Sequence, residues 1–438
     1  MNILDIIEKK RDKKELTKEE IEYFIKEYTN NNIADYQMAS LIMAIYLNGM
    51  TNKETADLTL AMAHSGEILD LSVLKKPIID KHSTGGVGDK VSLVLLPLIA
   101  SLGIPVAKMS GRGLGFTGGT IDKLESIPGY QTNIDINKFV QNVDKIGISI
   151  ISQTLNLAPA DKKIYALRDS IACVESIPLI ASSIMSKKIA SGAKEIVLDV
   201  TVGSGAFMEN KENAEKLAMQ MVDIGEKVGR KTVCLLTNMD EPLGYAVGNT
   251  LEVIEAINFL KGEKIKDLEE IVLQMGYHML LRAGEANSFS ESSEKLLENI
   301  KNGKAYDKFI ELVENQGGDI SYIDNPSKFE KAEYIEPVYA KKAGYVTKIN
   351  AKEVGKLACY LGAGRIKKED KINPRVGIVL NKKVSDKVKE KEILGYIHSD
   401  DKEKLNNAII ELEKIINISD KHVEQKPMLL GVINNGNL

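Results

Sequence analysis

The chain has few cysteines and no long apolar run, and each shortage excludes a class of protein. Cys173, Cys234 and Cys359 lie far apart and form no CxxC pair, which argues against a disulfide framework and against a structural zinc site. No run of about 18 apolar residues occurs, and the opening MNILDIIEKKRDKKELTKEE has no apolar signal segment. We therefore expect a cytoplasmic protein that neither is secreted nor enters a membrane.

The chain also lacks an excess of either charge. It has 58 Lys and Arg against 62 Asp and Glu, a net charge of -4, so we expect no polyanion-binding surface and no nucleic-acid partner. No repeat of fixed period and no low-complexity tract occurs. The 438 residues, 43% of them hydrophobic, are enough for two or three lobes, and clefts between lobes often bind ligands.

Helical and strand-rich patterns alternate along the sequence. The opening segment is helical, with capping boxes expected at Thr17 and Thr51. From about Ile78, strand-rich runs alternate with glycine loops and helices, which indicates βα units and a mostly parallel sheet. These runs are PIID, VSLVLLPLIASLG, IPVAKMSG, EIVLDVTVGSG and KTVCLLTN. After about Tyr334, short strands separated by turn residues precede a final helix near 401–416.

These patterns predict an α/β protein with a small all-helical domain, a large α/β domain with a mostly parallel central sheet, and a β-rich C-terminal lobe. The second helical stretch lies between strand-rich segments, so one domain interrupts the other. We expect the following segments: helical domain, 1–67 and 160–190; α/β domain, 72–155 and 192–332; C-terminal lobe with the final helix, 333–438.

The stretch KHSTGGVGDK, residues 81–90, predicts an anion-binding loop. It directly follows the strand-like PIID, and ligands of open α/β sheets bind at the carboxyl ends of strands. Glycines allow backbone N–H groups to face an anion, while Lys81 supplies charge and Ser83 a hydroxyl. Because Lys81 precedes the glycines, the pattern is not a Walker A loop. A tight turn with incidental polar residues is the alternative.

A second glycine loop, in KMSGRGLGFTGGTIDKLESIPG, follows the short strand IPVA. Ser110 and Thr120 add hydroxyl donors there, and Ser92 adds another from about two turns into a helix after the first loop. Such neutral and cationic donors suit phosphate or a phosphorylated group. The alternative is that these hydroxyls only cap turns and helices.

The interrupting helical segment carries a further set of donors. Ser183 and Lys187 are four residues apart, so they share one face of a helix, and Arg168 lies one helix earlier. They could bind the carbonyl oxygens of a flat ligand, or Lys187 could merely extend along apolar surface. His82, inside the first loop, could donate a proton near neutral pH.

The segments SGRGLGFTGGTIDKLE, DKHSTGGVGD, RDSIACVESIPLIASSIMSKK and LDVTVGSGAFM together resemble the thymidine and pyrimidine-nucleoside phosphorylase family. The resemblance covers nearly the whole chain and implies a homodimer with the active site in the cleft between the helical and α/β domains. It implies a phosphate site made by Lys81, Ser83, Ser92, Lys108, Ser110 and Thr120. It implies a pyrimidine site made by Arg168, Ser183 and Lys187. His82, Lys81, Arg168 and Lys187 would be the catalytic residues.

The resemblance also implies a monovalent cation, K⁺, as the one cofactor, with no organic cofactor. Its ligands would be backbone oxygens of Gly88, Lys90, Leu243 and Ala246, with the carboxylate of Glu255. Three positions depart from the family pattern: Phe116 stands in place of histidine, Thr201 in place of lysine, and Lys90 in place of a small residue.

The implied reaction is the reversible phosphorolysis of uridine, thymidine or deoxyuridine to free base and (2-deoxy)-α-D-ribose 1-phosphate, in pyrimidine salvage and nucleoside catabolism. Phosphate would attack C1′ with inversion. The preferred nucleoside stays open. A phosphoribosyltransferase similar to the anthranilate enzyme is the alternative enzyme, although no acidic pair beside the loops suggests its magnesium and pyrophosphate site. A carrier module, because the C-terminal lobe resembles biotinyl domains, and a noncatalytic nucleoside-binding protein are further alternatives.

Overall fold

The computed structural model describes residues 1–435 except 72, 73, 75, 77, 114, 154, 155 and 366–369. The expected domain boundaries at residues 72, 155 and 438 lie outside the described residues. Within this part of the chain, no helix is long and apolar enough to cross a membrane.

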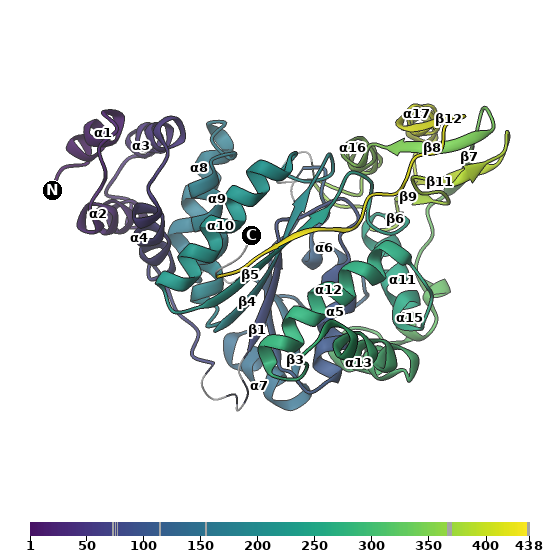
Figure 1. Cartoon of the computed structure of the whole chain (residues 1–438), viewed down its shortest axis with the longest axis horizontal. Helices are drawn as coiled ribbons and strands as arrows, with labels where there is room; N and C mark the ends of the chain where they lie inside the picture. Colours follow the sequence, from purple (N-terminus) through teal and green to yellow (C-terminus); the bar gives the residue numbers. More distant parts are fainter. Residues whose placement is uncertain are drawn as a thin grey trace.

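The helical unit joins the start of the chain to a later segment (Figure 1). Its helices are α1 (Ile3–Arg11), α2 (Lys18–Thr29), α3 (Asp35–Asn48), α4 (Asn52–Ala63), α8 (Pro159–Ser170) and α9 (Ile177–Ala190). The capping boxes at Thr17 and Thr51 form as expected, with the carboxylates of Glu20 and Glu54 bonded back to the cap. Ile164 of α8 and Leu179 of α9 belong to one apolar cluster with α1–α4, so burial holds the two segments together.

The main sheet has the strand order β1-β4-β5-β13. Three strands run parallel, namely β1 (Ile79–Ser83), β4 (Glu195–Val202) and β5 (Lys231–Asn238). Val197 of β4 packs in the cluster that contains α12 (Lys266–Ala283), whereas its neighbours Ile196 and Leu198 pack with α10 (Lys211–Lys227). The sheet is thus covered on both faces, as parallel sheets usually are. A second parallel pair, β2 (Val106–Ser110) and β3 (Ile148–Ser152), lies near β1.

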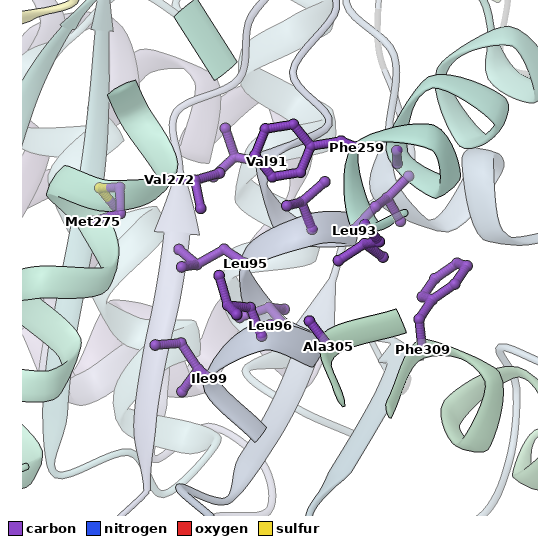
Figure 2. Close-up of a cluster of buried hydrophobic side chains, with 14 of the residues drawn as sticks. Val91, Leu93, Leu95, Leu96, Ile99, Phe259, Val272, Met275, Ala305 and Phe309 are labelled. Carbon is purple, nitrogen blue, oxygen red and sulfur yellow. The ribbon is translucent and has the colours of Figure 1, made fainter. Parts of the chain in front are cut away.

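The run VSLVLLPLIASLG, expected to be strand-rich, is mostly the helix α5 (Val91–Ser101), so that part of the strand prediction is wrong. Ten of its eleven residues are buried, and Figure 2 shows its side chains surrounded by Phe259, Val272 and Phe309. These come from α11 (Asn249–Leu260), α12 and α14 (Lys304–Asn315). A helix buried on all sides has no polar face, so its apolar run carries no helical period.

The C-terminal lobe contains two small antiparallel sheets, ordered β10-β8-β12 and β6-β9-β11-β7. Its elements are β6 (Ala246–Val247), β7 (Tyr334–Tyr339), β8 (Gly344–Ile349), α16 (Ala351–Leu361), β9 (Gly377–Leu380), β10 (Lys387–Val388), β11 (Ile393–Ser399), α17 (Lys402–Ile415) and β12 (Ile416–Ser419). The last strand, β13 (Leu429–Ile433), leaves this lobe and pairs antiparallel with β5 (Figure 1). The prediction of a C-terminal lobe at 333–438 did not include this return of the chain to the main sheet.

The remaining helices complete the α/β domain. They are α6 (Thr120–Leu124), α7 (Ile136–Ile146), α13 (Phe289–Lys301), α15 (Ser321–Asp324) and a 3₁₀ turn at Pro326–Lys328. The architecture confirms the predicted class: a helical domain, an α/β domain with a mostly parallel sheet, and a β-rich C-terminal region.

Candidate active site

A cavity of about 460 Å³ lies between the ends of β1 and β2 and the helices α8 and α9. Most of the residues that the sequence assigned to a site line it: His82, Ser83, Ser92, Lys108, Ser110, Thr120, Arg168, Ser183 and Lys187. Lys81 is buried and is not part of the cavity wall. The two glycine loops and the two helices, far apart in sequence, therefore enclose one space.

Lys81 lies in β1, with its ammonium 3.7 Å from Oδ2 of Asp199 in the adjacent strand β4. Among the described residues, neither of these two atoms has a hydrogen-bond partner. Burial raises the pKa of Asp199 to about 6, against the lowering effect of Lys81. A buried ammonium with free donor capacity is costly without an anion, so Lys81 is suited to bind one.

Lys108 of β2 lies in the cavity wall and shares the carboxylate of Asp80 with Lys188 of α9. Its Nζ is 3.5 Å from Asp80 Oδ1 and donates to the carbonyl oxygen of Lys81 at 2.6 Å, while Lys188 Nζ is 2.7 Å from Asp80 Oδ2. Burial, followed by the charges of Lys188 and Lys81, lowers the pKa of Lys108 to about 7, although Asp80 opposes this. Lys108 can therefore gain or lose a proton near neutral pH.

His82 follows Lys81 in β1 and is partly exposed in the cavity. Burial lowers the pKa of its imidazole well below the ordinary value, and the nearby charges of Lys188, Lys108, Lys187 and Lys81 lower it further. The ring is thus neutral at neutral pH. A neutral imidazole can donate one hydrogen bond but carries no proton to release as an acid.

The hydroxyl groups expected around an anion come from the ends of strands and the starts of helices. Ser83 and Ser110 are the last residues of β1 and β2. Thr120 is the first residue of α6, and Ser92 is the second residue of α5. Ser92 therefore lies in the first helical turn, not two turns into the helix as expected. Hydroxyls and backbone N–H groups at helix N-termini are suited to an anion.

On the opposite wall, α8 presents three residues spaced as i, i+4 and i+7: Asp161, Tyr165 and Arg168. The guanidinium carbon of Arg168 lies 5.8 Å from the centre of the Tyr165 ring. Arg168 donates to the carbonyl oxygens of Cys173 and Leu179, each at 3.1 Å, and of Val174. It therefore fixes the turn between α8 and α9 as well as lining the cavity.

The helix α9 contributes both donors and apolar surface. Lys187 Nζ is 2.9 Å from Ser183 Oγ and 2.5 Å from Asp161 Oδ2. Ile180 and Ile184, each three residues before one of these donors, line the cavity as well. An apolar wall beside directional donors is the usual composition of a site for a flat, partly polar ligand.

Sequence reasoning missed several residues of this cavity. Asp161 and Tyr165 carried a usable signal, since they share one helical face with Arg168. Thr84 and Gly85 also line the cavity, but they lie in a loop and share no such periodic pattern. They are tied to Thr201, whose hydroxyl donates to Gly85 O at 2.6 Å and lies 2.9 Å from Thr84 Oγ1. Thr201, which stands where the family pattern has lysine, thus fixes the first glycine loop.

Phe116, which stands where the family pattern has histidine, has a packing role. Its ring lies 6.4 Å from that of Phe207, which lines the cavity, and it also packs on the core of the C-terminal lobe. Phe116 therefore links the second glycine loop to that lobe by apolar contact.

The residues expected to bind a monovalent cation lie together beside the first loop. The side chain of Lys90 occupies their centre: its Nζ is 2.6 Å from Leu243 O, 3.1 Å from Ala246 O and 2.6 Å from Glu255 Oε2. Three of the five groups assigned to K⁺ are thus already bonded to an ammonium, so this donor set does not fit an added cation. K⁺ as a cofactor stays a prediction.

Three family models match the chain. One described as "Glycosyl transferase family, a/b domain" matches residues 75–306. A second, the helical bundle domain of the same family, matches 4–66, and "Pyrimidine nucleoside phosphorylase C-terminal domain" matches 345–419. Among solved structures, anthranilate phosphoribosyltransferase from Thermus thermophilus has a similar fold. It has a TM-score of 0.59 at 19% identity, over 71% of this chain and 99% of that one.

Curated relatives are similar over nearly the full length. The pyrimidine-nucleoside phosphorylase of Geobacillus stearothermophilus is 53% identical over 98% of this chain and 99% of its own. Those of Staphylococcus haemolyticus and Staphylococcus aureus are 53% and 52% identical, over 95% and 99% of this chain and 96% and 100% of their own. Such identity across the whole length establishes that the chain belongs to the pyrimidine-nucleoside phosphorylase family.

Proposed function

We propose that this chain catalyses the reversible phosphorolysis of pyrimidine nucleosides. A phosphate oxygen attacks C1′ with inversion, and the C1′–N1 bond breaks with its electron pair passing to the base. The base anion takes up one proton while hydrogenphosphate gives up its own, so free pyrimidine and (2-deoxy)-α-D-ribose 1-phosphate form. The observation that carries the proposal is the shared cavity, with hydroxyl and lysine donors on the α/β wall and Arg168, Ser183 and Lys187 on the helical wall.

The α/β wall suits the phosphate. Ser83, Ser92, Ser110 and Thr120 offer hydroxyl donors at strand and helix ends, and charge-assisted hydrogen bonds to phosphate oxygens are among the strongest available to a protein. Lys81 lies beneath this wall with donor capacity to spare. Held in place, phosphate acts as nucleophile and as counter-charge to a sugar that becomes cationic.

The helical wall suits the base. Negative charge grows on the pyrimidine as the glycosidic bond breaks, so donors at its carbonyl oxygens bind the transition state more tightly than the neutral nucleoside. Lys187 supplies one such donor and Arg168 another. The neutral His82 contributes a hydrogen bond toward the base or the glycosidic bond, because its lowered pKa leaves no proton to transfer at neutral pH.

The decisive experiment incubates the purified chain with uridine, thymidine or deoxyuridine, with and without phosphate, and measures free base and sugar 1-phosphate. We expect base release only with phosphate, in equal amount to sugar 1-phosphate of the α anomer. Base release that ignores phosphate would indicate a hydrolase, and binding of nucleoside without release would indicate a binding protein. Relative rates with the three nucleosides give the sugar and base preference.

We also propose that the chain acts as a homodimer in the cytoplasm. Support for the dimer comes from α3, which exposes Tyr36, Met43 and Leu47, three residues at i, i+7 and i+11 that share one helical face. Sedimentation of the wild type should give twice the chain mass, and Leu47→Glu should shift the chain toward the monomer. A wild type that sediments as a monomer would contradict the dimer.

A further inference from the structure

The ammonium of Lys90 is bonded like a metal ion in an oxygen cage. Lys90 is fully buried, and its three N–H donors meet three oxygens: Leu243 O, Ala246 O and Glu255 Oε2. Those oxygens have further support, because the Glu255 carboxylate accepts the backbone N–H of Tyr245 at 2.7 Å and of Ala246 at 3.0 Å. The ammonium is therefore saturated.

The cage has no room for a second cation. A Cβ added at Gly88 would lie 2.6 Å from Leu243 O, and one added at Gly244 would lie 2.9 Å from Lys90 Nζ. Both glycines have positive φ, 75° and 66°, so the surrounding backbone turns closely around Nζ. A metal ion bound to the same three oxygens would have to coincide with Nζ, and two like charges there would repel.

The cage joins the first glycine loop to the segment 241–247. Val87 O of the loop accepts the backbone N–H of Leu243 at 3.0 Å. From the C-terminal lobe, Lys383 Nζ donates to Gly244 O of the same segment at 3.1 Å. It also lies 3.5 Å from the carboxylate of Glu241 in that segment and 2.9 Å from the carboxylate of Asp267 in α12. Two lysines therefore lie among three buried carboxylates, and Glu255, the carboxylate that belongs to the cage, is already paired with Lys90.

We propose that Lys90 is a built-in cation: its ammonium takes the position that a monovalent metal ion would otherwise occupy between the first glycine loop and segment 241–247. The wild type then needs no K⁺ to fold or to turn over. Lys90 acts as a positioning residue, since it holds the loop that carries Ser83 and leads into Ser92 but does not itself line the cavity.

The test compares the thermal unfolding of the full chain in KCl, NaCl and choline chloride at equal ionic strength, by calorimetry. We expect the wild-type Tm to be the same in KCl and choline chloride. Lys90→Ser removes the ammonium and leaves space and a hydroxyl, so its Tm should be lower in choline chloride and rise saturably with KCl. Lys90→Met fills the same space without charge, so its Tm should be low in both salts.

The outcomes separate this inference from the proposed function, because Tm is measured without substrate. A wild-type Tm that rises saturably with K⁺ beyond its value in choline chloride would overturn the proposal. So would a Lys90→Ser chain that K⁺ fails to stabilise, including one that stays unfolded in KCl. As a second readout, kcat/KM of the wild type should not change between the two salts, while that of Lys90→Ser should rise roughly tenfold or more with K⁺.

Discussion

Lys81 and Lys90 stand at the two ends of one ten-residue stretch, both fully buried, yet their surroundings differ. The ammonium of Lys90 contacts three oxygens within 3.1 Å. That of Lys81 lies 3.7 Å from one carboxylate and, within the described part of the chain, makes no hydrogen bond. The protein satisfies the donors of one ammonium and leaves those of the other free.

The difference shows why burial alone does not identify a binding residue. A buried charge with all donors satisfied contributes to structure, and its removal leaves its partners unpaired. A buried charge with unmet donors costs stability, and a fold retains it where a bound anion repays that cost. Within one ten-residue stretch, the count of satisfied donors thus separates Lys81, for which we propose a role in phosphate binding, from Lys90, for which we propose a structural role.

The largest expected effect is on activity, from Lys81→Met. Phosphate loses a cation in a site of low dielectric constant, so kcat/KM for phosphate should fall by about 10²–10³-fold. The fold should survive, because burial already raises the pKa of Asp199 to about 6 and its carboxylate can take up a proton when Lys81 is lost. Steady-state rates of base release and circular dichroism measure the two effects.

The matched control is Lys227→Met, on the exposed side of α10, where Lys227 forms an ion pair with Asp223 at 2.9 Å. Surface pairs of this kind contribute little, so both rate and fold should stay near wild type. Turnover of Lys81→Met within about tenfold of wild type would contradict the role assigned to Lys81.

Lys90→Met should have the opposite profile, with its main effect on stability. Removing the ammonium leaves the carboxylate of Glu255 buried without a cation, which typically costs about 3–5 kcal/mol in free energy of unfolding. Urea unfolding at neutral pH, with Lys81→Met alongside, measures it. If Lys81→Met lost as much stability as Lys90→Met, the distinction between the two lysines would fail.

Lys187→Met tests the other wall of the cavity. The carboxylate of Asp161, 2.5 Å from Nζ, already offsets part of the Lys187 charge, so we expect the lower end of the range for such donors, a fall in kcat of about 10²-fold. KM for the nucleoside should change less, since the contact strengthens as the base becomes negative. The control is Lys162→Met, because Lys162 lines the same cavity and has no assigned role. An equal fall in kcat in that variant would mean that any positive charge beside the cavity supports the rate, and not a specific contact from Lys187.

Much of the fold and the site was predictable from local patterns. The capping boxes, the alternation of strands and helices, and the spacing of Ser183 and Lys187 depend on neighbours within four residues, and periodicity reports such contacts. The helix α5 was misassigned because a segment buried on all sides shows no period.

Features that depend on distant partners were not predictable in this way. Nothing near Lys90 indicates that its ammonium meets Leu243 and Glu255, more than 150 residues away. The return of β13 to pair with β5 crosses nearly 200 residues. Local composition cannot encode such contacts, since they exist only after the chain has folded around them.

The smallest expected effect concerns Lys108 and pH. Its pKa, lowered to about 7 by burial and by Lys188, means that the ammonium is largely neutral at about pH 8, one unit above that value. A bound phosphate dianion favours the charged form, so binding at about pH 8 should take up a proton. After correction for the ionisation of phosphate itself, affinity for the dianion should fall severalfold from about pH 6 to about pH 8. Titration calorimetry of phosphate in buffers of different ionisation enthalpy measures the uptake. In Lys108→Arg, whose guanidinium stays charged throughout, the proton uptake and the matching part of the pH dependence should disappear. Uptake that persists unchanged would assign it to another group, whereas its loss would show that the cavity has a third kind of buried lysine, charged only when its ligand arrives.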